Sequence, residues 1–204
     1  MYGDTMATTQ DRLIETTREL LWERGYVGTS PKAILQRAGV GQGSMYHHFT
    51  GKQDLALAAI RRTGEEMRTL VDRVLGGGGS ARERIEAYLL RERDVLRGCP
   101  VGRLTMDPDV ITSDELREPV AETIAYVEGR IADAVQEGVE SGELAARLVP
   151  REVAATVVAT VQGGYVLARA SGDTTAFDAG VRGLLALLSP APPATAPAAV
   201  AADH

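Results

Sequence analysis

The spacing of apolar residues constrains this chain most, because it repeats every three to four positions along most of the sequence. Near the start, one helical face gathers Leu13, Ile14, Thr17, Leu20 and Leu21, and charged residues occupy the other faces. The alternating runs that are typical of half-buried strands are missing, and aromatic residues make up only 4% of the chain. The sequence therefore predicts an all-α protein.

Glycine, proline and capping residues divide this pattern into nine predicted helices. The first ends at Gly25, the second starts at Pro31 after the N-cap Ser30, and Gly142 ends the seventh. The second to the ninth cover 31–38, 42–49, 52–75, 81–97, a short stretch from about 100 to 108, 113–141, 150–170 and a stretch after 173 that ends at 188.

Charge is unevenly distributed along the chain. The net charge is -6, yet residues 24–62 hold six basic side chains against one acidic side chain. Residues 74–204 hold 12 basic and 19 acidic side chains. A local basic excess is what contact with phosphates requires, so the balance favours a nucleic-acid surface near the N-terminus. Chance clustering of solvated charge, with Lys32 and Arg37 among it, is the alternative.

Cysteine usage and hydropathy bear on the compartment. Cys99 is the single cysteine, so no intrachain disulfide forms, which suits a reducing cytoplasm. The N-terminal MYGDTMATTQ lacks the basic and apolar regions of a secretory signal, and no apolar run reaches the roughly 18 residues of a membrane span. We expect a cytoplasmic protein without a membrane partner.

Residues 28–49 have the pattern of a helix-turn-helix. Two short helices are joined by the turn Gly39-Val40-Gly41, and Ile34, Leu35, Ala38 and Val40 are expected inside the corner. At 100° per residue, the second of these helices directs Met45 and Phe49 to the core. The opposite side and the flanks carry hydrogen-bonding groups that a major groove can accommodate: Gly43, Ser44, Tyr46, His47 and His48.

The stretch GVGQGSMYHHFTGKQDL, residues 39–55, resembles the signature of the TetR family of bacterial regulators. The resemblance is strong over residues 10–60 and extends further in helix number and spacing. It implies an all-helical homodimer with a helix-turn-helix DNA-binding domain at 9–52 and a helical ligand-binding and dimerisation domain at 53–188. Residues 1–8 and the Pro/Ala-rich tail 189–204 are expected to be disordered.

The resemblance implies that the chain is a ligand-responsive repressor of a near-palindromic operator in double-stranded DNA. It also implies roles for single residues. Tyr46, His47 and His48 would contact phosphates or base edges, and Lys52 would hold a phosphate. Gly43 would allow close approach, and the base readers would be Gln42 and Ser44.

Two positions depart from the family pattern, which often has Ser or Thr at position 41 and Lys at position 42. Gly41 is a weaker cap, and Gln42 removes one charge for phosphate contact. The alternatives are that Tyr46 is a packing residue and that His47 and His48 bind zinc, although adjacent helix positions diverge by 100°.

The second domain is expected to pair with its copy and to enclose an effector. Pairing is assigned to the eighth and ninth helices through Ala154, Ala155, Val158, Val161, Gly164, Tyr165, Ala168, Val181, Leu184, Leu185 and Leu188, with an internal core face as the alternative. The candidate pocket residues for a small organic molecule are Tyr88, Leu89, Glu92, Leu104, Met106, Ile124, Tyr126, Val127, Arg130, Gln162 and Tyr165.

Cys99 is a further candidate, because a thiol at the start of the sixth helix would be favoured as a reactive thiolate. An electrophile- or redox-sensing repressor is therefore an alternative, as is a buried inert cysteine. An enzyme using Glu92 and Cys99, or the His47-His48 pair, lacks a recognisable nucleophile–base pairing, and no metal or cofactor is expected. A helical adaptor that binds only proteins is the third alternative, and salt-dependent DNA binding separates it from a regulator.

Overall fold

The computed structural model of the chain describes residues 8–188, over which it contains nine α-helices, one 3-10 helix and no strand. This confirms the all-α prediction. The expected disorder of 1–7 and 189–204 lies outside the described residues. The elements are α1 (Thr9–Arg24), α2 (Pro31–Ala38), α3 (Gln42–His48), α4 (Lys52–Leu75), α5 (Ala81–Leu90), η1 (Gly102–Met106), α6 (Pro108–Thr112), α7 (Asp114–Glu140), α8 (Pro150–Ser171) and α9 (Thr175–Leu188).

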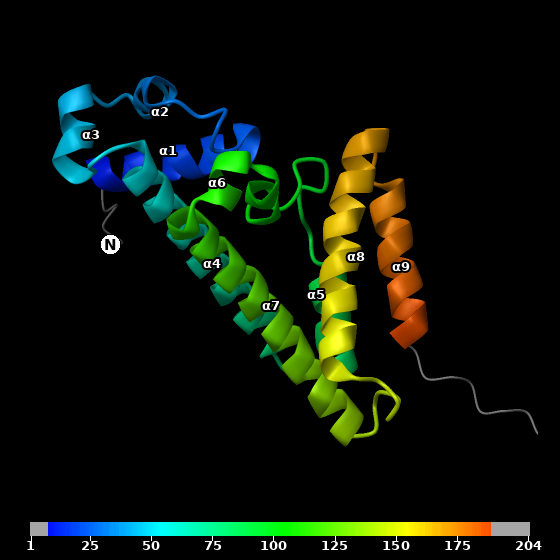
Figure 1. Cartoon of the computed structure of the whole chain (residues 1–204). Helices are drawn as coiled ribbons and strands as arrows, with labels where there is room; N and C mark the ends of the chain where they lie inside the picture. The colour runs from blue at the N-terminus through cyan, green and yellow to red at the C-terminus, as the bar shows by residue number, and fades with distance from the viewer. Residues whose placement is uncertain (1–7, 189–204) are drawn as a thin grey trace, which may run out of the picture.

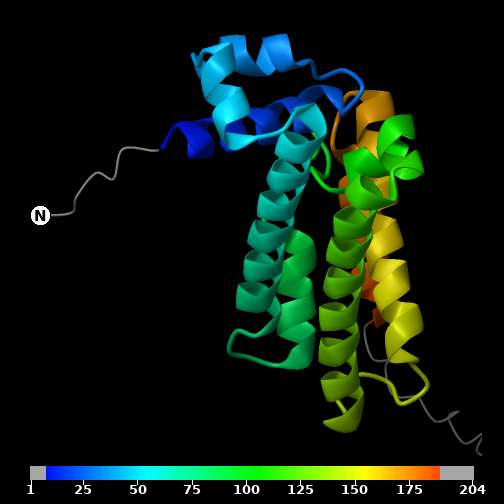
Figure 2. The same cartoon turned by 60° about the vertical axis from the view of Figure 1, so that its left-hand side comes forward.

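The first three helices form a head at one end of the long helices (Figures 1 and 2). Helices α4 and α7 run side by side away from this head, and α8 packs between α7 and α9. α1 lies across the top of α4 and also contacts η1. The short elements η1 and α6 therefore sit where the head meets the long helices.

Two hydrophobic cores hold this arrangement together. One lies among α4, α5, α7, α8 and α9, around Ile131, Val157 and Tyr165. The other fills the head around Leu13 and Met45, and it continues into η1, α6 and the start of α7. The buried core of the head therefore extends beyond residue 52, the predicted domain boundary, into η1, α6 and the start of α7.

Local capping fixes the ends of the head helices. Thr8, expected in a disordered N-terminus, is the N-cap of α1 and accepts a hydrogen bond from the Asp11 N–H at 3.1 Å. α1 ends at Gly25, whose φ of 74° lies in the left-handed region that favours glycine. Ser30 caps α2 by accepting from the Ala33 N–H at 3.2 Å, as the sequence predicts.

The segment between α5 and α7 differs from the prediction. α5 ends at Leu90 instead of 97, because the Arg93 guanidinium donates to the carbonyls of Tyr88 and Leu89 and so satisfies the end of the helix. Pro108 was expected to stop the sixth helix, yet it begins α6, with Asp107 as the N-cap. Proline suits a first helical turn because its missing N–H needs no partner there.

The orientation of α8 and α9 corrects a second expectation. Among the residues assigned to pairing between two copies, Val161, Ala168 and Leu184 are buried within this chain. The internal-core alternative therefore holds for that face. The opposite side of the two helices exposes Leu167 and Leu187, which are 56% and 76% accessible. By length and mean hydropathy alone α8 would be long and apolar enough to cross a membrane, but its inner face packs against α7 and α9.

Candidate DNA-binding surface and effector cavities

Helix α3 has one buried and one exposed side. Met45 and Phe49 point into the core of the head, at 0% and 5% exposure, and Ile34 and Ala38 of α2 lie in the same core. Tyr46 is 54% exposed, so the packing alternative does not hold for this residue. The whole polar set predicted to meet DNA on α3 is exposed: Gln42, Gly43, Ser44, Tyr46, His47 and His48.

The surface around α3 is open. A Cβ atom built on Gly41 or Gly43 meets nothing within 4 Å, so no packing within this chain requires either glycine. Gly41 is the N-cap of α3 and supplies no side-chain hydrogen bond, which leaves the first N–H groups of the helix to solvent. The rings of His47 and His48 meet edge to face, with centroids 4.9 Å apart.

Two basic residues near α3, Arg12 and Lys52, make contacts within the head. Arg12 of α1 donates through Nη2 to the carbonyls of Ala38 and of Gly39, the latter at 3.2 Å, and so fastens the end of α2. Lys52, predicted to hold a phosphate, places its Nζ 3.8 Å from the centre of the Tyr26 ring. Burial lowers the pKa of Lys52, while the nearby Asp109 and Asp107 act in the opposite direction.

An open cleft, which we call the outer cleft, lies between the head and α8 and has a volume of about 410 Å³. Its lining residues Arg24 and Gly25 place it at the C-terminal end of α1. Helix α3 lies toward the opposite end of α1 (Figure 1). Its walls come from the end of α1, from the loop after α5, from η1 and from α8. They include Arg24, Cys99, Arg103, Met106, Asp107, Gln162, Tyr165, Val166 and Arg169.

A smaller space, the inner cavity, adjoins the outer cleft and lies in the core between α4, α5, α7 and α8. Its volume of about 30 Å³ leaves room for little more than a water molecule. Cys99, Gln162 and Tyr165 line both spaces. The other inner walls are Met67, Tyr88, Arg91, Val101, Thr123, Ile124, Val127, Val158 and Val161.

The predicted pocket residues divide into two groups. Tyr88, Cys99, Gln162 and Tyr165 line one or both spaces, and so do Met106, Ile124 and Val127. Five others lie elsewhere. Leu89 and Leu104 are buried in the two cores, and Glu92 is exposed beyond the end of α5. Tyr126 and Arg130 face α4, where both bind the carboxylate of Asp72, at 2.8 Å and 2.9 Å.

Cys99 is half-buried and is not at the start of a regular α-helix as expected. It lies in a turn before η1, and its Sγ accepts a hydrogen bond from the Gly102 N–H at 3.2 Å. The backbone of Gly102 also approaches Gln162 so closely that a Cβ there would lie 2.3 Å from the Gln162 Oε1. The thiol, the turn and α8 are therefore packed as one unit.

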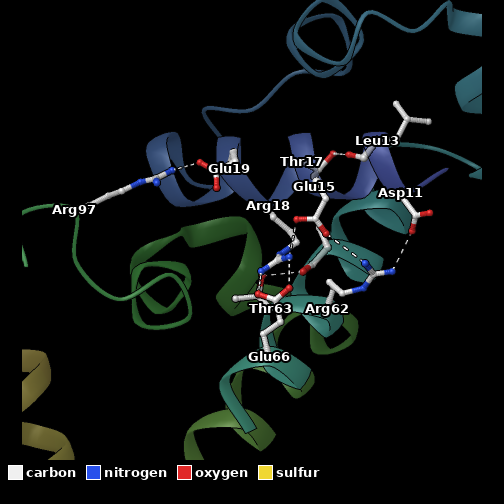
Figure 3. Close-up of polar contacts among 11 residues, drawn as sticks. Asp11, Leu13, Glu15, Thr17, Arg18, Glu19, Arg62, Thr63, Glu66 and Arg97 are labelled. Carbon is white, nitrogen blue, oxygen red and sulfur yellow. Dashed lines mark hydrogen bonds and ion pairs between the residues drawn. The ribbon is translucent and has the colours of Figure 1, made fainter. Parts of the chain in front are cut away.

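The outer cleft is connected directly to the head. Asp107 accepts a hydrogen bond from the Val27 N–H at 2.9 Å, which joins the start of α6 to the loop between α1 and α2. Trp22 of α1 donates through Nε1 to the Gly98 carbonyl at 3.1 Å. Arg97 stacks on the Trp22 ring, with its Cζ 3.6 Å from the ring centre, and pairs with Glu19 (Figure 3).

A second set of contacts fastens α1 to α4, as Figure 3 shows. Arg18 lies between Glu15 of its own helix, at 2.7 Å, and Glu66 of α4. Arg62 of α4 reaches Asp11 and Glu15 at 3.4 Å and 3.3 Å. Exposed ion pairs stabilise weakly one by one, but a network on one helix face fixes the relative position of α1 and α4.

The chain matches two family models. Residues 13–59 match the bacterial regulatory proteins of the tetR family, and residues 79–184 match the tetracyclin repressor-like C-terminal domain. A curated relative is the HTH-type transcriptional regulator LmrA of Bacillus subtilis, which is 29% identical over 134 residues. That alignment covers 62% of this chain and 68% of LmrA.

Solved structures share the fold. The reduced form of Escherichia coli NemR superposes with a TM-score of 0.78 at 23% identity, over 86% of this chain and 94% of NemR. A TetR regulator from Chloroflexus aurantiacus gives a TM-score of 0.79 at 28% identity, over 87% and 92% of the two chains. Since the family matches cover both the head and the helices around the two cavities, the chain belongs to the TetR family of bacterial transcriptional regulators.

Proposed function

We propose that the chain is a cytoplasmic repressor that binds a near-palindromic operator as a homodimer and leaves it when a small organic effector binds. The observation that carries this proposal is α3, whose polar side is exposed while Met45 and Phe49 anchor it in the head. A short helix held in this way fits a major groove, and its flanking groups reach phosphates.

Promoter selection with the purified chain tests DNA binding. We expect a preferred fragment to bind with an affinity that falls steeply as salt is raised. Tyr46→Ala should weaken binding by at least about tenfold, since the exposed ring and hydroxyl lie where the duplex docks. Tyr126→Ala, the same change on α7, should leave DNA binding unchanged. A chain that ignores every fragment even in dilute buffer contradicts the proposal and favours a protein-binding adaptor.

The proposed dimer uses the exposed side of α8 and α9. Leu167 and Leu187 are large apolar side chains on that side, and the small residues Gly163 and Gly183 next to them allow close helix approach. Two-fold pairing there would produce a four-helix bundle. It would place two α3 helices about 34 Å apart, one helical turn of DNA, which is why the operator should be nearly palindromic.

The proposed effector site is the outer cleft together with the inner cavity. A molecule that fills them touches the loop after α5, η1, Asp107 and α8. The loop binds Trp22 of the head through the Gly98 carbonyl, and Asp107 binds the Val27 N–H of the head. Binding would therefore favour a different position of the head. By linkage, effector and operator must weaken each other to the same extent, and equal effector affinities with and without operator would rule this scheme out.

Thiol sensing is a second candidate, because the half-buried Cys99 lines both spaces. Modification of its Sγ would place a new group between η1 and α8. The experiment compares wild type with Cys99→Ser: N-ethylmaleimide should release operator only from the wild type. Equal release from both proteins contradicts the role of this thiol and leaves effector binding untouched.

A further inference from the structure

Arginine side chains dominate the charge of the two spaces. Arg24, Arg103 and Arg169 line the outer cleft, and Arg91 lines the inner cavity. The one carboxylate among the lining residues is that of Asp107. Its oxygens already accept hydrogen bonds from backbone N–H groups of the head and of α6. The cavity wall is therefore strongly positive in a domain whose overall balance is acidic.

None of these four arginines forms an ion pair within the part of the chain that the structure describes. Between residues 8 and 188, eight other arginines pair with carboxylates, and none of these four does. The Nε atoms of Arg91 and Arg103 are also buried without a hydrogen-bond acceptor. A buried charged donor left unpaired is unfavourable, so an acceptor supplied from outside would be bound well.

Electrostatics within the outer cleft point the same way. Burial lowers the pKa of Arg103, the positive charge of Arg169 lowers it further, and Asp107 acts in the opposite direction. The two guanidinium groups thus repel each other in the absence of a ligand. An anion placed between them would remove that repulsion and accept charge-assisted hydrogen bonds from both.

We propose that the effector is an organic anion whose head group, a carboxylate, sulfonate or phosphate ester, binds Arg103 and Arg169 in the outer cleft. This inference rests on the proposed function and names the chemical class of its effector. The apolar body of the molecule lies along Met106, Val166 and Tyr165. The outer cleft, with a volume of about 410 Å³, holds a molecule of moderate size by itself. A longer effector would also have to enter the inner cavity, which would then have to widen.

The same placement supplies a reason for release. The anion would lie beside Asp107, whose carboxylate holds the Val27 N–H of the head. Two negative charges in one cleft repel each other, so ligand binding weakens this link. The state in which the head has moved away from α6 is then favoured, which is the linkage that repression by an effector-released dimer requires.

Calorimetry with 4-phenylbutyrate and its neutral amide, 4-phenylbutyramide, tests the proposal on the full chain. The two probes share the phenylbutyl body, and the charged, acceptor-only carboxylate of one is a neutral amide in the other. We expect the carboxylate to bind at least about tenfold more tightly. Arg103→Gln and Arg169→Gln should each remove most of that preference. Arg151→Gln, an exposed arginine on α8 outside the cleft, should retain it.

Three results would each overturn the proposal. They are equal affinity for the two probes, no binding of the carboxylate at millimolar concentration, and a preference that survives when Arg103→Gln and Arg169→Gln are combined. If Arg103→Gln fails to fold, the exposed Arg169→Gln still decides. Operator binding measured without probe separates the repressor proposal from the proposal that the effector is an anion. A wild type that binds no promoter fragment contradicts the repressor, whereas one that binds DNA but does not distinguish the probes contradicts the anion alone.

Discussion

Helices α3 and α8 differ in how plainly their sequences define their orientation. In α3, polar side chains occupy every position except Gly43 and the inward Met45, and both sides were assigned correctly. In α8, small and apolar residues occur all round, and the face assigned to a second copy is the one buried inside the chain. A helix shows which side is buried only when its two sides differ in polarity.

The comparison also separates two kinds of surface. The exposed side of α3 comes from one continuous stretch of seven residues. The exposed side of α8 forms a larger apolar surface only together with α9, because our proposal places Leu187 of α9 beside Leu167 of α8 on one face. Substitutions on the inner and outer sides of α3 and α8 test this contrast.

Met45→Ala should have the largest effect, because it empties a fully buried site beneath α3. We expect the free energy of unfolding to fall by about 2–5 kcal/mol, measured by urea denaturation. Gln42→Ala, an exposed change on the same helix, should stay within about 0.5 kcal/mol. A loss as small as this in Met45→Ala would show that α3 is not anchored as described.

Leu167→Arg should separate the two copies, since it places a charge in the middle of the proposed apolar face of α8. The dissociation constant of the dimer, measured by analytical ultracentrifugation, should rise at least about a hundredfold. Val149→Arg, at an exposed apolar position just before α8, is the matched control. A dimer unaffected by Leu167→Arg would place the interface on another surface.

Gly164→Ala tests the inner side of α8. A Cβ at this position would lie 2.7 Å from the Cδ2 and 3.4 Å from the Cα of Phe177, so α9 would have to move. We expect a loss of about 1–3 kcal/mol in the free energy of unfolding, seen by thermal and urea denaturation. An unchanged stability would mean that α8 and α9 are less closely packed than this structure shows.

Gly163→Ala, one residue earlier, should act in the opposite direction. A Cβ there meets nothing within 4 Å in this chain, and alanine favours a helix interior over glycine. In the monomeric Leu167→Arg background we expect a gain of about 0.5–1 kcal/mol in the free energy of unfolding. In the dimeric background the gain should shrink, because the added methyl group crowds the partner. Destabilisation of the monomer would contradict the outward direction of Gly163.

Most helix boundaries were predictable because they depend on local chemistry. Ser30, Gly25 and Gly172 act through their own backbone or through a residue three positions away. The stretch between α5 and α7 was not predictable in the same way. The guanidinium of Arg93 ends α5 by reaching back to carbonyls four and five residues earlier, an irregular side-chain contact that spacing does not indicate. Asp107 caps α6 and also binds the Val27 N–H of the head, which is 80 residues away in the sequence.

The two candidate sites differ in the same respect. The exposed side of α3 was predicted residue by residue, because one helix and its burial pattern define it, and its contact with DNA stays a prediction. The lining of the two spaces was predicted only in part, because their walls come from segments spread along the chain from α1 to α8. Tyr126 and Arg130 belong to the expected helix, but they face Asp72 of α4, and nothing in the local sequence indicates which neighbour that side meets.

The position of α1 allows a small rotation at the outer cleft to become a larger displacement near α3. Its C-terminal end borders the outer cleft, and near its other end Arg12 grips the end of α2, the helix before α3. Its 16 residues span about 24 Å at 1.5 Å per residue. A pivot of about 5° at the cleft would sweep the far end through about 2 Å over that length. That displacement exceeds half the length of a hydrogen bond, so in the proposed complex a small rotation of α1 would be enough to misalign α3 with the groove.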